Sequence, residues 1–329
     1  MAKITVLGAG GWGMALAIHS KKLGHEVVIW SPFKSEVENL AKNRQNNKLL
    51  DGVILDERIV VTDDITLANG SDITIIATPS FAVRETAARL KSVDCGVVVN
   101  VAKGFEKGTM LRLSEVIEQE LPDKKIVVLS GPSHAEEVAV DVPTSVVVAS
   151  KQEKVSTFVQ ECLMGGALRI YTVSDLIGVE IGGALKNVIA VAAGIENGLK
   201  MGDNTRAALI TRGLAEMARL GVALGGSADT FMGLSGLGDL VVTCMSQHSR
   251  NNRFGNLIGN GVSVKDALET VGTVEGYYAA ENVYKLGKKH GVEMPITEQC
   301  YRILYENATP LEALKNLMNR PKKSEEIWN

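Results

Sequence analysis

The chain has 329 residues, of which 45% are hydrophobic and 22% are charged, and its formal net charge is -3. Such a length favours two domains over one, and the balance of residues is that of an ordinary globular protein. The near-neutral charge argues against nucleic acid as the main partner, because a phosphate backbone requires a basic surface.

In the first half of the chain, short β-branched runs alternate with helical patterns. Strands are expected at Ile4–Leu7, Val27–Trp30, Ile73–Ala77, Gly96–Val101, Ile126–Leu129 and Ser145–Ala149. Helices are expected at Met14–Leu23, Lys34–Asn43, Phe81–Leu90 and Leu111–Glu120. The strand runs are apolar throughout, as in a parallel sheet that is covered on both faces. Repeated strand–helix units of this kind predict a doubly wound α/β domain.

The second half has a different pattern, because β-branched runs become rare and long helical patterns replace them. Helices are expected at Asp175–Asn197, Thr205–Leu220, Val264–Glu269, Glu275–His290, Met294–Glu306 and Pro310–Met318. We therefore predict an α/β domain over residues 1–175 and an all-α domain over residues 176–329. The tail Arg320–Asn329, with a proline and mixed charge, is expected to lack regular structure.

Cysteine usage and hydropathy bear on the location of the protein. Cys95, Cys162, Cys244 and Cys300 are far apart in sequence, and no histidine lies near them at the spacing of a zinc site. We therefore expect no structural metal, and four free thiols of the kind found in reducing compartments. The first residues enter a predicted strand at once, so no signal peptide is expected, and polar residues interrupt the longest apolar stretches, so no membrane span is expected. These features predict a cytoplasmic protein.

The first predicted strand runs into Gly8-Ala9-Gly10-Gly11-Trp12-Gly13, and a helical pattern follows. This is G-x-G-x-x-G between a strand and a helix, the context in which the motif binds a dinucleotide. Gly8 allows the tight turn, Gly10 allows the backbone to approach a pyrophosphate, and Gly13 allows the helix to pack on the sheet. The N–H groups at the start of the helix then face the diphosphate. We predict a Rossmann-like cofactor domain; a glycine-rich turn that binds nothing is the less favoured alternative in this context.

The end of the second predicted strand bears on the choice of cofactor. Folds specific for NAD usually carry an acid there, about 20 residues beyond the glycines, which holds the ribose hydroxyls. Here Ser31 stands in place of the acid, and Lys34 is close to it. The absence of a carboxylate removes repulsion against a 2′-phosphate, and Lys34 could attract that group. These residues favour NADP(H) and leave NAD(H) open. An equal alternative for Lys34 is that it is an ordinary solvated lysine at the start of the next helix.

The predicted helix Asp175–Asn197 carries one lysine on a face of small residues. At roughly 100° per residue, one apolar face is formed by Ile181, Leu185, Val188, Ala192 and Ile195. Lys186 and Asn187 fall on the other side, among Gly183, Ala190 and Gly194. An ordinary solvated face would carry several Lys and Glu, so this pattern predicts a concavity beside Lys186 or close contact with another element. Burial lowers the pKa of a lysine, which suits proton transfer; the alternative is a lysine that extends from the helix edge into solvent.

Two further segments contain residues suited to catalysis or binding. Gly233-Leu234-Ser235-Gly236-Leu237-Gly238-Asp239 is a glycine-rich turn that presents one carboxylate, and Thr243 follows a few residues later. Ser249-Arg250-Asn251-Asn252-Arg253 clusters guanidinium and amide donors, and Arg is suited to bidentate recognition of phosphate. A capped turn and an exposed basic loop are the structural alternatives for the two segments.

Together, eight segments resemble the bacterial-type NAD(P)-dependent glycerol-3-phosphate dehydrogenases, over essentially the whole chain. The segments are Gly8–Gly13, Val101–Glu106, Leu129–Ala135, Gly183–Asn187, Asn204–Gly213, Gly236–Leu240, Ser249–Asn251 and Val274–Gly276. One of them alone would be weak evidence, whereas eight in this order are highly specific.

The resemblance implies roles for individual residues. Lys186 is implied to be the general acid/base and Lys103 a second cation of the active site, while Asp239 and Thr243 orient the lysine and the substrate. The residues implied to bind the substrate are Lys103, Gly131, Ser133, Lys186, Asn187, Asp239, Ser249, Arg250 and Asn251, of which the last three hold its phosphate.

The resemblance also implies a set of cofactor contacts. These are Gly8, Gly10, Gly11, Trp12, Gly13, Phe33, Lys34, Lys103, Ala135, Arg250, Val274 and Glu275. Many relatives carry Arg or His between positions 31 and 34, where this chain has Ser, Pro, Phe and Lys. The preference between NADH and NADPH is therefore left open by the resemblance.

The implied function is an oxidoreductase that interconverts dihydroxyacetone phosphate and sn-glycerol 3-phosphate with NAD(P)H and supplies glycerol 3-phosphate for phospholipid synthesis. One alternative is another two-domain, lysine-dependent dehydrogenase of the β-hydroxyacid or 6-phosphogluconate type. A second is a catalytically silent NADP(H)-binding sensor, although the presence of Lys103, Lys186 and Asp239 together argues against it. A homodimer is compatible with the sequence, which does not define the oligomeric state.

Overall fold

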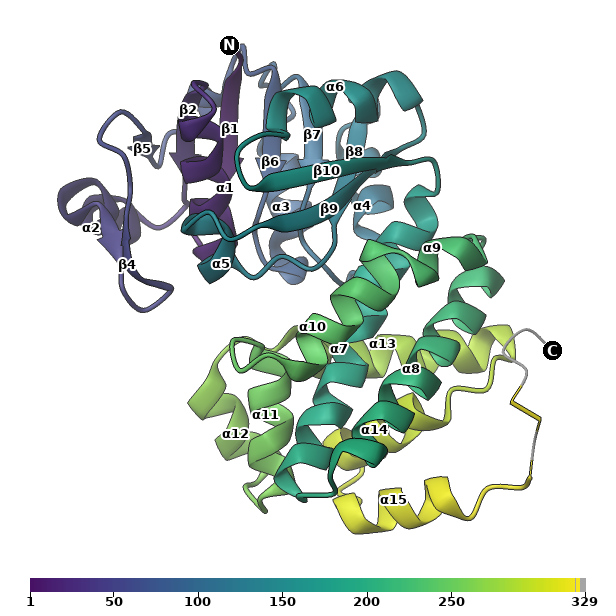
Figure 1. The fold of residues 1–329 in the computed structure, drawn as a ribbon. Coiled ribbons are helices and arrows are strands. Elements are labelled where there is room, and N and C mark those ends of the chain that lie inside the picture. The colour runs from purple at the N-terminus through teal and green to yellow at the C-terminus, as the bar shows by residue number, and fades with distance from the viewer. Residues whose placement is uncertain (323, 326–329) are drawn as a thin grey trace. The chain divides into compact units, whose positions relative to one another are not determined.

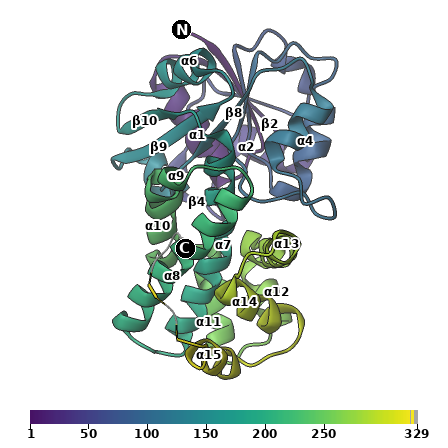
Figure 2. The same cartoon turned by 90° about the vertical axis from the view of Figure 1, so that its right-hand side faces the viewer.

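The computed structural model describes residues 1–322 and 324–325, and the chain divides into two compact units. The first unit consists of Met1–Glu106 and Leu111–Leu176, and the second of Lys107–Met110 and the chain from Ile177 onward. Figures 1 and 2 show a sheet with helices in the first unit and helices in the second. The tail Arg320–Asn329, for which the sequence predicts no regular structure, lies partly outside the described residues.

The first unit is built on an eight-stranded sheet with the order β10-β9-β8-β7-β6-β1-β2-β5. Its strands are β1 (Lys3–Leu7), β2 (Glu26–Trp30), β5 (Val60–Thr62), β6 (Ile73–Ile76), β7 (Val97–Asn100), β8 (Ile126–Ser130), β9 (Thr144–Ser150) and β10 (Leu168–Val173). All neighbouring strands are parallel except β8 and β9. A separate antiparallel pair is formed by β3 (Gln45–Asn46) and β4 (Leu50–Ile54).

Helices cover both faces of this sheet (Figure 1). They are α1 (Gly11–Lys22), α2 (Lys34–Asn43), α3 (Val83–Ala88), α4 (Leu113–Glu120), α5 (Ala135–Ala139) and α6 (Glu153–Leu163), with 3₁₀ turns η1 (Ile65–Ala68) and η2 (Ser80–Ala82). Successive residues of one strand enter different cores: Ile75 packs in the cluster that contains α1, and Ile76 in the cluster that contains α3 and α4. Burial of both faces explains why the central strands are apolar throughout, and the predicted doubly wound fold is confirmed.

The structure differs from the expected all-parallel sheet at its far edge. Strand β9 runs antiparallel to β8, and β10 then pairs with β9 as the edge strand. An apolar run indicates that a strand is buried on both faces but does not encode its direction, so the sequence could not show the reversal. In β10, which was not predicted, the exposed Arg169 and Tyr171 interrupt the apolar pattern.

The regular elements of the second unit are all helices among its described residues, as predicted. Its elements are α7 (Leu176–Gly198), α8 (Asp203–Ala223), α9 (Ala228–Met232), the π-helical turn η3 (Leu234–Gly238), α10 (Asp239–Met245), α11 (Arg250–Gly259), α12 (Val264–Val271), α13 (Glu275–His290), α14 (Pro295–Tyr305) and α15 (Pro310–Met318). Helices α9, α10 and α11 were not predicted, because the glycines and polar residues of this stretch obscure the helical period.

Helix α7 is the central helix of the second unit. Among the described residues it is the one helix long and apolar enough to cross a membrane, but 89% of its apolar window is buried inside the protein. Its small face lies against α11, because a Cβ atom at Gly194 would lie 2.1 Å from the carbonyl oxygen of Asn252, and one at Gly255 would lie 2.1 Å from that of Val191. The face of small residues that the sequence analysis found on this helix therefore makes a close helix–helix contact.

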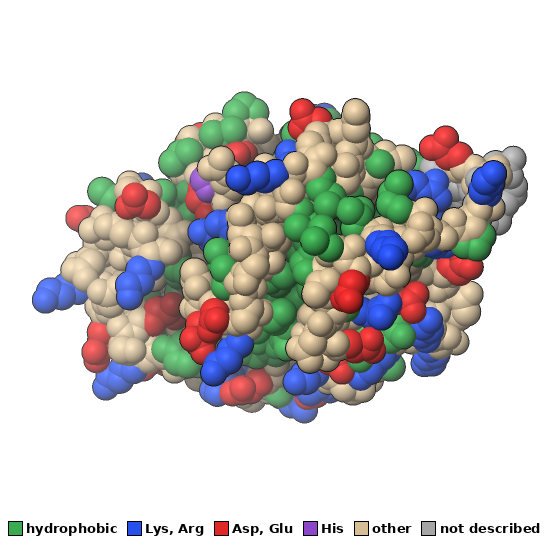
Figure 3. Space-filling model, turned by 90° about the horizontal axis from the view of Figure 1, so that it is seen from below, with side chains coloured by type: hydrophobic (Ala, Val, Ile, Leu, Met, Phe, Trp, Pro, Cys, Tyr) green, Lys and Arg blue, Asp and Glu red, His purple; other side chains and the backbone are tan. Residues whose placement is uncertain are grey.

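A cavity of about 270 Å³ lies between α7, α8, α14 and α15. Figure 3, which looks from below, shows hydrophobic side chains gathered in a hollow on this face. Glu216 of α8 lines the cavity, and its carboxylate accepts hydrogen bonds from the backbone N–H groups of Ile296 (2.6 Å) and Thr297 (3.1 Å). These N–H groups at the start of α14 have no partner within their own helix, so Glu216 joins α14 to α8.

Candidate functional site

The glycine-rich turn lies at the carboxyl end of β1, and its backbone approaches a neighbouring strand end closely. Gly8 has a φ of +117°, and a Cβ atom there would lie 2.8 Å from the carbonyl oxygen of Ala77. A Cβ atom at Gly13 would lie 2.0 Å from the carbonyl oxygen of Gly8. A side chain at Gly8 would push the turn away from the end of β6, and one at Gly13 would push α1 away from the turn, which agrees with the roles predicted for the two glycines.

The first turn of α1 is open to a ligand. Gly10 is the N-cap residue, no side chain caps the helix, and a Cβ atom at Gly10 would meet nothing within 4 Å. Ala135 borders the same turn, since its Cβ lies 3.7 Å from a Cβ built on Gly11. Uncapped N–H groups at a helix start, in a turn that a ligand can approach, suit a diphosphate. The residues present therefore fit a dinucleotide.

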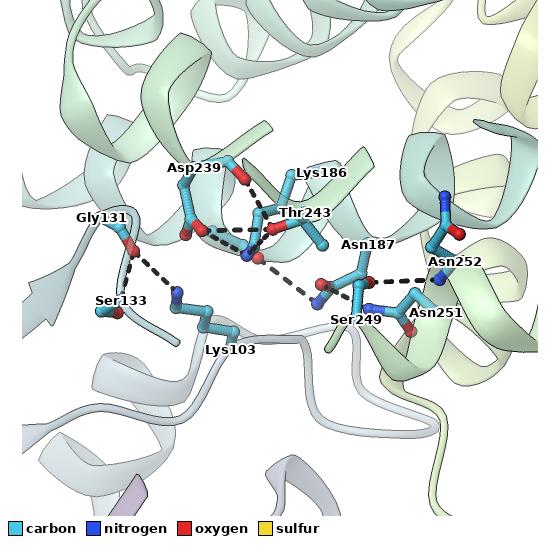
Figure 4. Close-up of polar contacts among 11 residues, drawn as sticks. Lys103, Gly131, Ser133, Lys186, Asn187, Asp239, Thr243, Ser249, Asn251 and Asn252 are labelled. Carbon is cyan, nitrogen blue, oxygen red and sulfur yellow. Dashed lines mark hydrogen bonds and ion pairs between the residues drawn. The ribbon is translucent and has the colours of Figure 1, made fainter. Parts of the chain in front are cut away.

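Three residues predicted to bind the substrate lie together in the first unit (Figure 4). The Nζ of Lys103 donates a hydrogen bond to the carbonyl oxygen of Gly131 at 3.2 Å, and the Oγ of Ser133 donates to the same oxygen at 3.0 Å. Gly131 has a φ of +141°, and a Cβ atom there would lie 2.9 Å from the Cα of Val146. Glycine is thus required where the chain leaves β8, and the half-buried ammonium of Lys103 is held at this strand end.

The loop that carries Lys103 is anchored by an arginine that the sequence did not single out. Arg84 of α3 forms a two-point ion pair with Glu106, with N–O distances of 2.5 and 2.9 Å. Its remaining donors reach Glu120 (2.7 Å) and Gln119 (2.8 Å) at the end of α4. Paired Arg–carboxylate bonds of this kind fix orientation as well as distance. Sequence periodicity alone could not find Arg84, because its partners are 22 to 36 residues away.

A buried lysine is the centre of the second group of candidate residues (Figure 4). Lys186 of α7 is 5% exposed, and its ammonium forms an ion pair with the carboxylate of Asp239. The same ammonium donates a hydrogen bond of 2.6 Å to the Oγ1 of Thr243, which in turn donates to the backbone carbonyl oxygen of Asp239 at 2.6 Å. The alternative of a lysine extending into solvent is therefore excluded.

Glycines bring Asp239 to the lysine. A Cβ atom at Gly182 of α7 would lie 2.7 Å from the carbonyl oxygen of Ser235, and one at Gly236 would lie 2.1 Å from that of Phe231. The π-helical turn η3 thus packs directly on the α7 backbone, and Asp239 follows it as the first residue of α10, where it is 1% exposed. The glycine-rich motif provides the close approach that the ion pair needs.

The thiol of Cys244, beside this cluster, does not compete with Lys186 and Asp239 for a proton. Cys244 follows Thr243 in the chain and is 1% exposed. Burial raises the pKa of its thiol to about 12, although the charge of Lys186 opposes this shift. Near neutral pH, Cys244 is thus a neutral thiol, and Lys186 and Asp239 are the ionisable groups of the cluster.

The amides of Asn187 and Asn251 join three helices. The Nδ2 of Asn251 on α11 donates to the Oδ1 of Asn187 on α7 at 2.9 Å, and the N–H of Gly276 on α13 donates to the Oδ1 of Asn251 at 2.8 Å. Val274 and Glu275 stand at the start of α13, where Val274 is fully buried and Glu275 is half-buried. This network fixes the position of the α13 start relative to α7.

The three residues predicted to hold the substrate phosphate differ in their surroundings. Ser249 is 4% exposed and caps α11, with its Oγ accepting a hydrogen bond from the N–H of Asn252 at 3.2 Å. The amide of Asn251 is engaged in the network just described. Arg250, the first residue of α11, is exposed and forms no ion pair with the described residues. Of the three, Arg250 is thus the side chain free to meet an anion.

The candidate residues thus form two sets, one in each unit. Those of the first unit suit a diphosphate and place one cation, Lys103, at a strand end. Those of the second unit hold an ammonium group against a carboxylate away from water, which suits proton transfer to an oxygen atom. Within the described part of the chain, no three His, Cys, Asp or Glu side chains come together as a metal site would require.

Two models of known families match the chain. Residues 3–156 match the N-terminal part of NAD-dependent glycerol-3-phosphate dehydrogenase, and residues 175–315 match its C-terminal part. Together they cover well over half of the chain, and the second match begins at the point where α7 starts.

Curated relatives and a solved structure carry the same name. The chain is 50% identical over 331 residues to a glycerol-3-phosphate dehydrogenase [NAD(P)+] of Fusobacterium nucleatum, with 99% of each chain covered. It is 50% identical over 326 residues to the enzyme of that name from Thermoanaerobacter sp., with 98% of each covered. The structure of glycerol-3-phosphate dehydrogenase from Coxiella burnetii aligns with a TM-score of 0.93 at 41% identity, over 97% of this chain and 99% of that one.

Replacement of Arg84 tests whether it anchors the Lys103 loop. In Arg84→Met, Glu106 loses both of its bonds to the guanidinium, so amide hydrogen exchange in residues 103–111 should become about tenfold faster. Exchange in β1 and α6 should stay unchanged. Hydrogen exchange followed by mass spectrometry on the folded variant makes the measurement.

Arg89→Met is the matched control, because Arg89 directly follows α3, the helix that contains Arg84, and pairs with an exposed glutamate, Glu85, at 2.7 Å. It should leave the loop unaffected. Equal exchange of the loop in wild type and Arg84→Met would show that Arg84 is not its anchor.

Proposed function

The chain belongs to the family of NAD-dependent glycerol-3-phosphate dehydrogenases, and we propose that Lys186 moves the proton when it interconverts dihydroxyacetone phosphate and glycerol 3-phosphate. The family, the reaction and the use of NAD(P) predicted from the sequence are thereby confirmed. The roles of individual residues stay predictions, and the geometry of the Lys186 cluster is the observation that carries them.

Lys186 has the position and the partners of a general acid. In the reducing direction, negative charge grows on the ketone oxygen of the substrate, and an ammonium group stabilises it before donating a proton. Asp239 neutralises the charge of Lys186 inside the helical unit, and Thr243 fixes the direction of the Nζ. The bound dinucleotide supplies the hydride. In the reverse direction, the neutral amine of Lys186 takes the proton back from the alcohol.

Lys103 supplies a second cation in this proposal. Its Nζ is directed by the carbonyl oxygen of Gly131, which also orders the hydroxyl of Ser133. The carbonyl oxygen fixes the direction of the ammonium, and we propose that Lys103 attracts an anionic or polarised oxygen of the substrate. The charge of Lys186 is balanced by Asp239.

Arg250 is proposed to bind the substrate phosphate. The phosphate is remote from the reacting carbon, so its binding energy can fix the ketone for reaction. Among the three residues predicted for this role, Arg250 has an exposed guanidinium, while Ser249 and Asn251 hold α11 and α13 in place. We therefore assign direct phosphate recognition to Arg250 and positioning to the other two.

A survey of substrates distinguishes the proposed reaction from the alternative functions considered for this sequence. A ketopantoate reductase and a D-mandelate dehydrogenase share the fold with TM-scores of 0.63, but their identities of 12% and 13% carry no inference on substrate. We expect dihydroxyacetone phosphate, and no 2-keto acid, to drive oxidation of NADH or NADPH. Cofactor binding without turnover of any of these substrates would instead favour the silent sensor.

We place the enzyme in the cytoplasm, where its product would supply the backbone of phospholipids. The four cysteines are free thiols, as suits a reducing compartment. The apolar helix α7 is an internal helix of the second unit.

Arg250→Ala tests the phosphate assignment. The variant should lose about a hundredfold in kcat/KM for dihydroxyacetone phosphate, since charge-assisted bonds to phosphate are among the strong ones. Unphosphorylated dihydroxyacetone should lose much less. Arg253→Ala, another exposed arginine of α11, serves as the control and should change neither value greatly. Equal losses on both substrates in Arg250→Ala would remove Arg250 from phosphate recognition.

Lys186→Ala tests the proton transfer. The change removes an interaction made mainly in the transition state, so kcat should fall by about 10²-fold or more, while the Kd for NADH stays near normal. Lys186→Arg should not restore the rate, because a guanidinium stays protonated near neutral pH. Thermal midpoint, NADH affinity and kcat are measured on the same samples. A stable Lys186→Ala protein that keeps most of its kcat would leave Lys103 as the proton donor.

A further inference from the structure

The end of β2 lies beside the glycine-rich turn. The N–H of Gly8 donates a hydrogen bond of 2.8 Å to the carbonyl oxygen of Trp30, the last residue of β2. In dinucleotide-binding folds this strand end adjoins the adenosine ribose, where an acid binds the hydroxyls and a cation accommodates a 2′-phosphate. The inference that follows rests on the use of a dinucleotide by the proposed function.

A carboxylate is present at this strand end, although the residue after β2 is a serine. Ser31 is 1% exposed, and its Oγ donates a hydrogen bond to the Oε2 of Glu36. The N–H of Phe33 donates to the same Oγ at 3.3 Å. Glu36 stands in the first turn of α2, and its N–H donates to the carbonyl oxygen of Phe33 at 3.0 Å. The helix thus returns Glu36 to the place where an acid is expected.

The carboxylate of Glu36 retains capacity for a ligand. Its Oε2 is held by Ser31, while its Oε1 accepts no hydrogen bond from the described residues. The side chain is half-buried, so its position is defined and part of it is accessible. An ionised carboxylate accepts hydrogen bonds and donates none. Glu36 can therefore accept from a ribose hydroxyl, and it would repel a phosphate at the same position.

Two cations near the end of β2 would attract the 2′-phosphate that Glu36 repels. Lys34 is exposed and forms no ion pair within the described chain, so its charge is solvated and screened. The guanidinium of Arg89 lies 5.8 Å from the ring centre of Trp30 and is paired with Glu85 at 2.7 Å. Of the charged groups of Lys34, Arg89 and Glu36, that of Glu36 is the one held by a buried side chain, the hydroxyl of Ser31.

We propose that Glu36, held by Ser31, selects NAD(H) over NADP(H) in this enzyme. The sequence favoured NADP(H) because Ser31 occupies the position of the acid and Lys34 is near it. That argument considered Ser31 and Lys34 and could not show that the serine hydroxyl binds a carboxylate five positions further on.

The test measures the affinities of NADH and NADPH for the protein without substrate, by nicotinamide fluorescence. Glu36→Gln removes the charge and keeps an oxygen that can accept from Ser31. Glu38→Gln removes an exposed glutamate of the same helix and is the matched control. Lys34→Gln isolates the opposing lysine. Ser31→Ala removes the hydroxyl that holds Glu36 and leaves the charge.

Wild type should bind NADH at least tenfold more tightly than NADPH, and Glu36→Gln should reduce that ratio about tenfold, as expected when a hydrogen bond to a charged group is lost. Ser31→Ala should reduce it less, and Glu38→Gln should leave it unchanged. A wild type that prefers NADPH, or a Glu36→Gln protein with an unchanged ratio, would overturn the proposal. A change confined to Lys34→Gln would assign the choice to Lys34.

The same proteins are assayed for kcat/KM with dihydroxyacetone phosphate, and circular dichroism confirms that each is folded. Failure of wild type to reduce this substrate would refute the proposed function, while the affinity ratios would still decide the role of Glu36. The two ideas can therefore fail separately.

Discussion

The structure of the second unit depends on one constraint, the burial of the Lys186 ammonium away from water. A buried charge requires a partner of opposite charge and further hydrogen bonds, and Asp239 and Thr243 provide them. The close packing of η3 on α7 at Gly182 brings the carboxylate there. Since a buried ion pair is often no more stabilising than an apolar pair of similar size, its presence at the centre of the helical unit is better explained by catalysis than by stability.

The first unit depends on a different constraint. Its glycine-rich turn presents backbone groups, rather than side chains, to the place proposed for the dinucleotide. Gly8 and Gly13 are required because the turn, β6 and α1 approach too closely for a Cβ atom, and the position of Gly10 is open. Side chains are then supplied by the segments that follow other strands: Lys103 lies on the loop after β7 that Arg84 anchors, and Glu36 lies on the helix that follows β2. These positions support our proposal that the backbone binds the dinucleotide, while Lys103 and Glu36 adjust the choice of substrate and of cofactor.

The sequence predicted features that repeat locally and missed those that depend on distant pairing. Apolar periodicity located β1, β2 and α7, and the glycine motif located the cofactor turn. Periodicity does not encode strand direction, so the reversal of β9 was missed, and it does not encode side-chain partners. The bonds from Arg84 to Glu106 and from Asn251 to Asn187 span 22 and 64 residues. Ser31 and Glu36 are only five residues apart, but a helix start has to form before they meet.

The most direct test of the central claim is to restore the amine of Lys186 chemically. Lys186→Cys removes it, and aminoethylation of the new thiol returns an ammonium group on a side chain of nearly the same length. Wild type treated in the same way controls for modification of the partly exposed Cys162. We expect the unmodified variant to lose about 10²-fold or more in kcat and the aminoethylated protein to recover most of it. An aminoethylated protein that binds NADH normally but remains as slow as the unmodified variant would contradict the claim that Lys186 moves the proton.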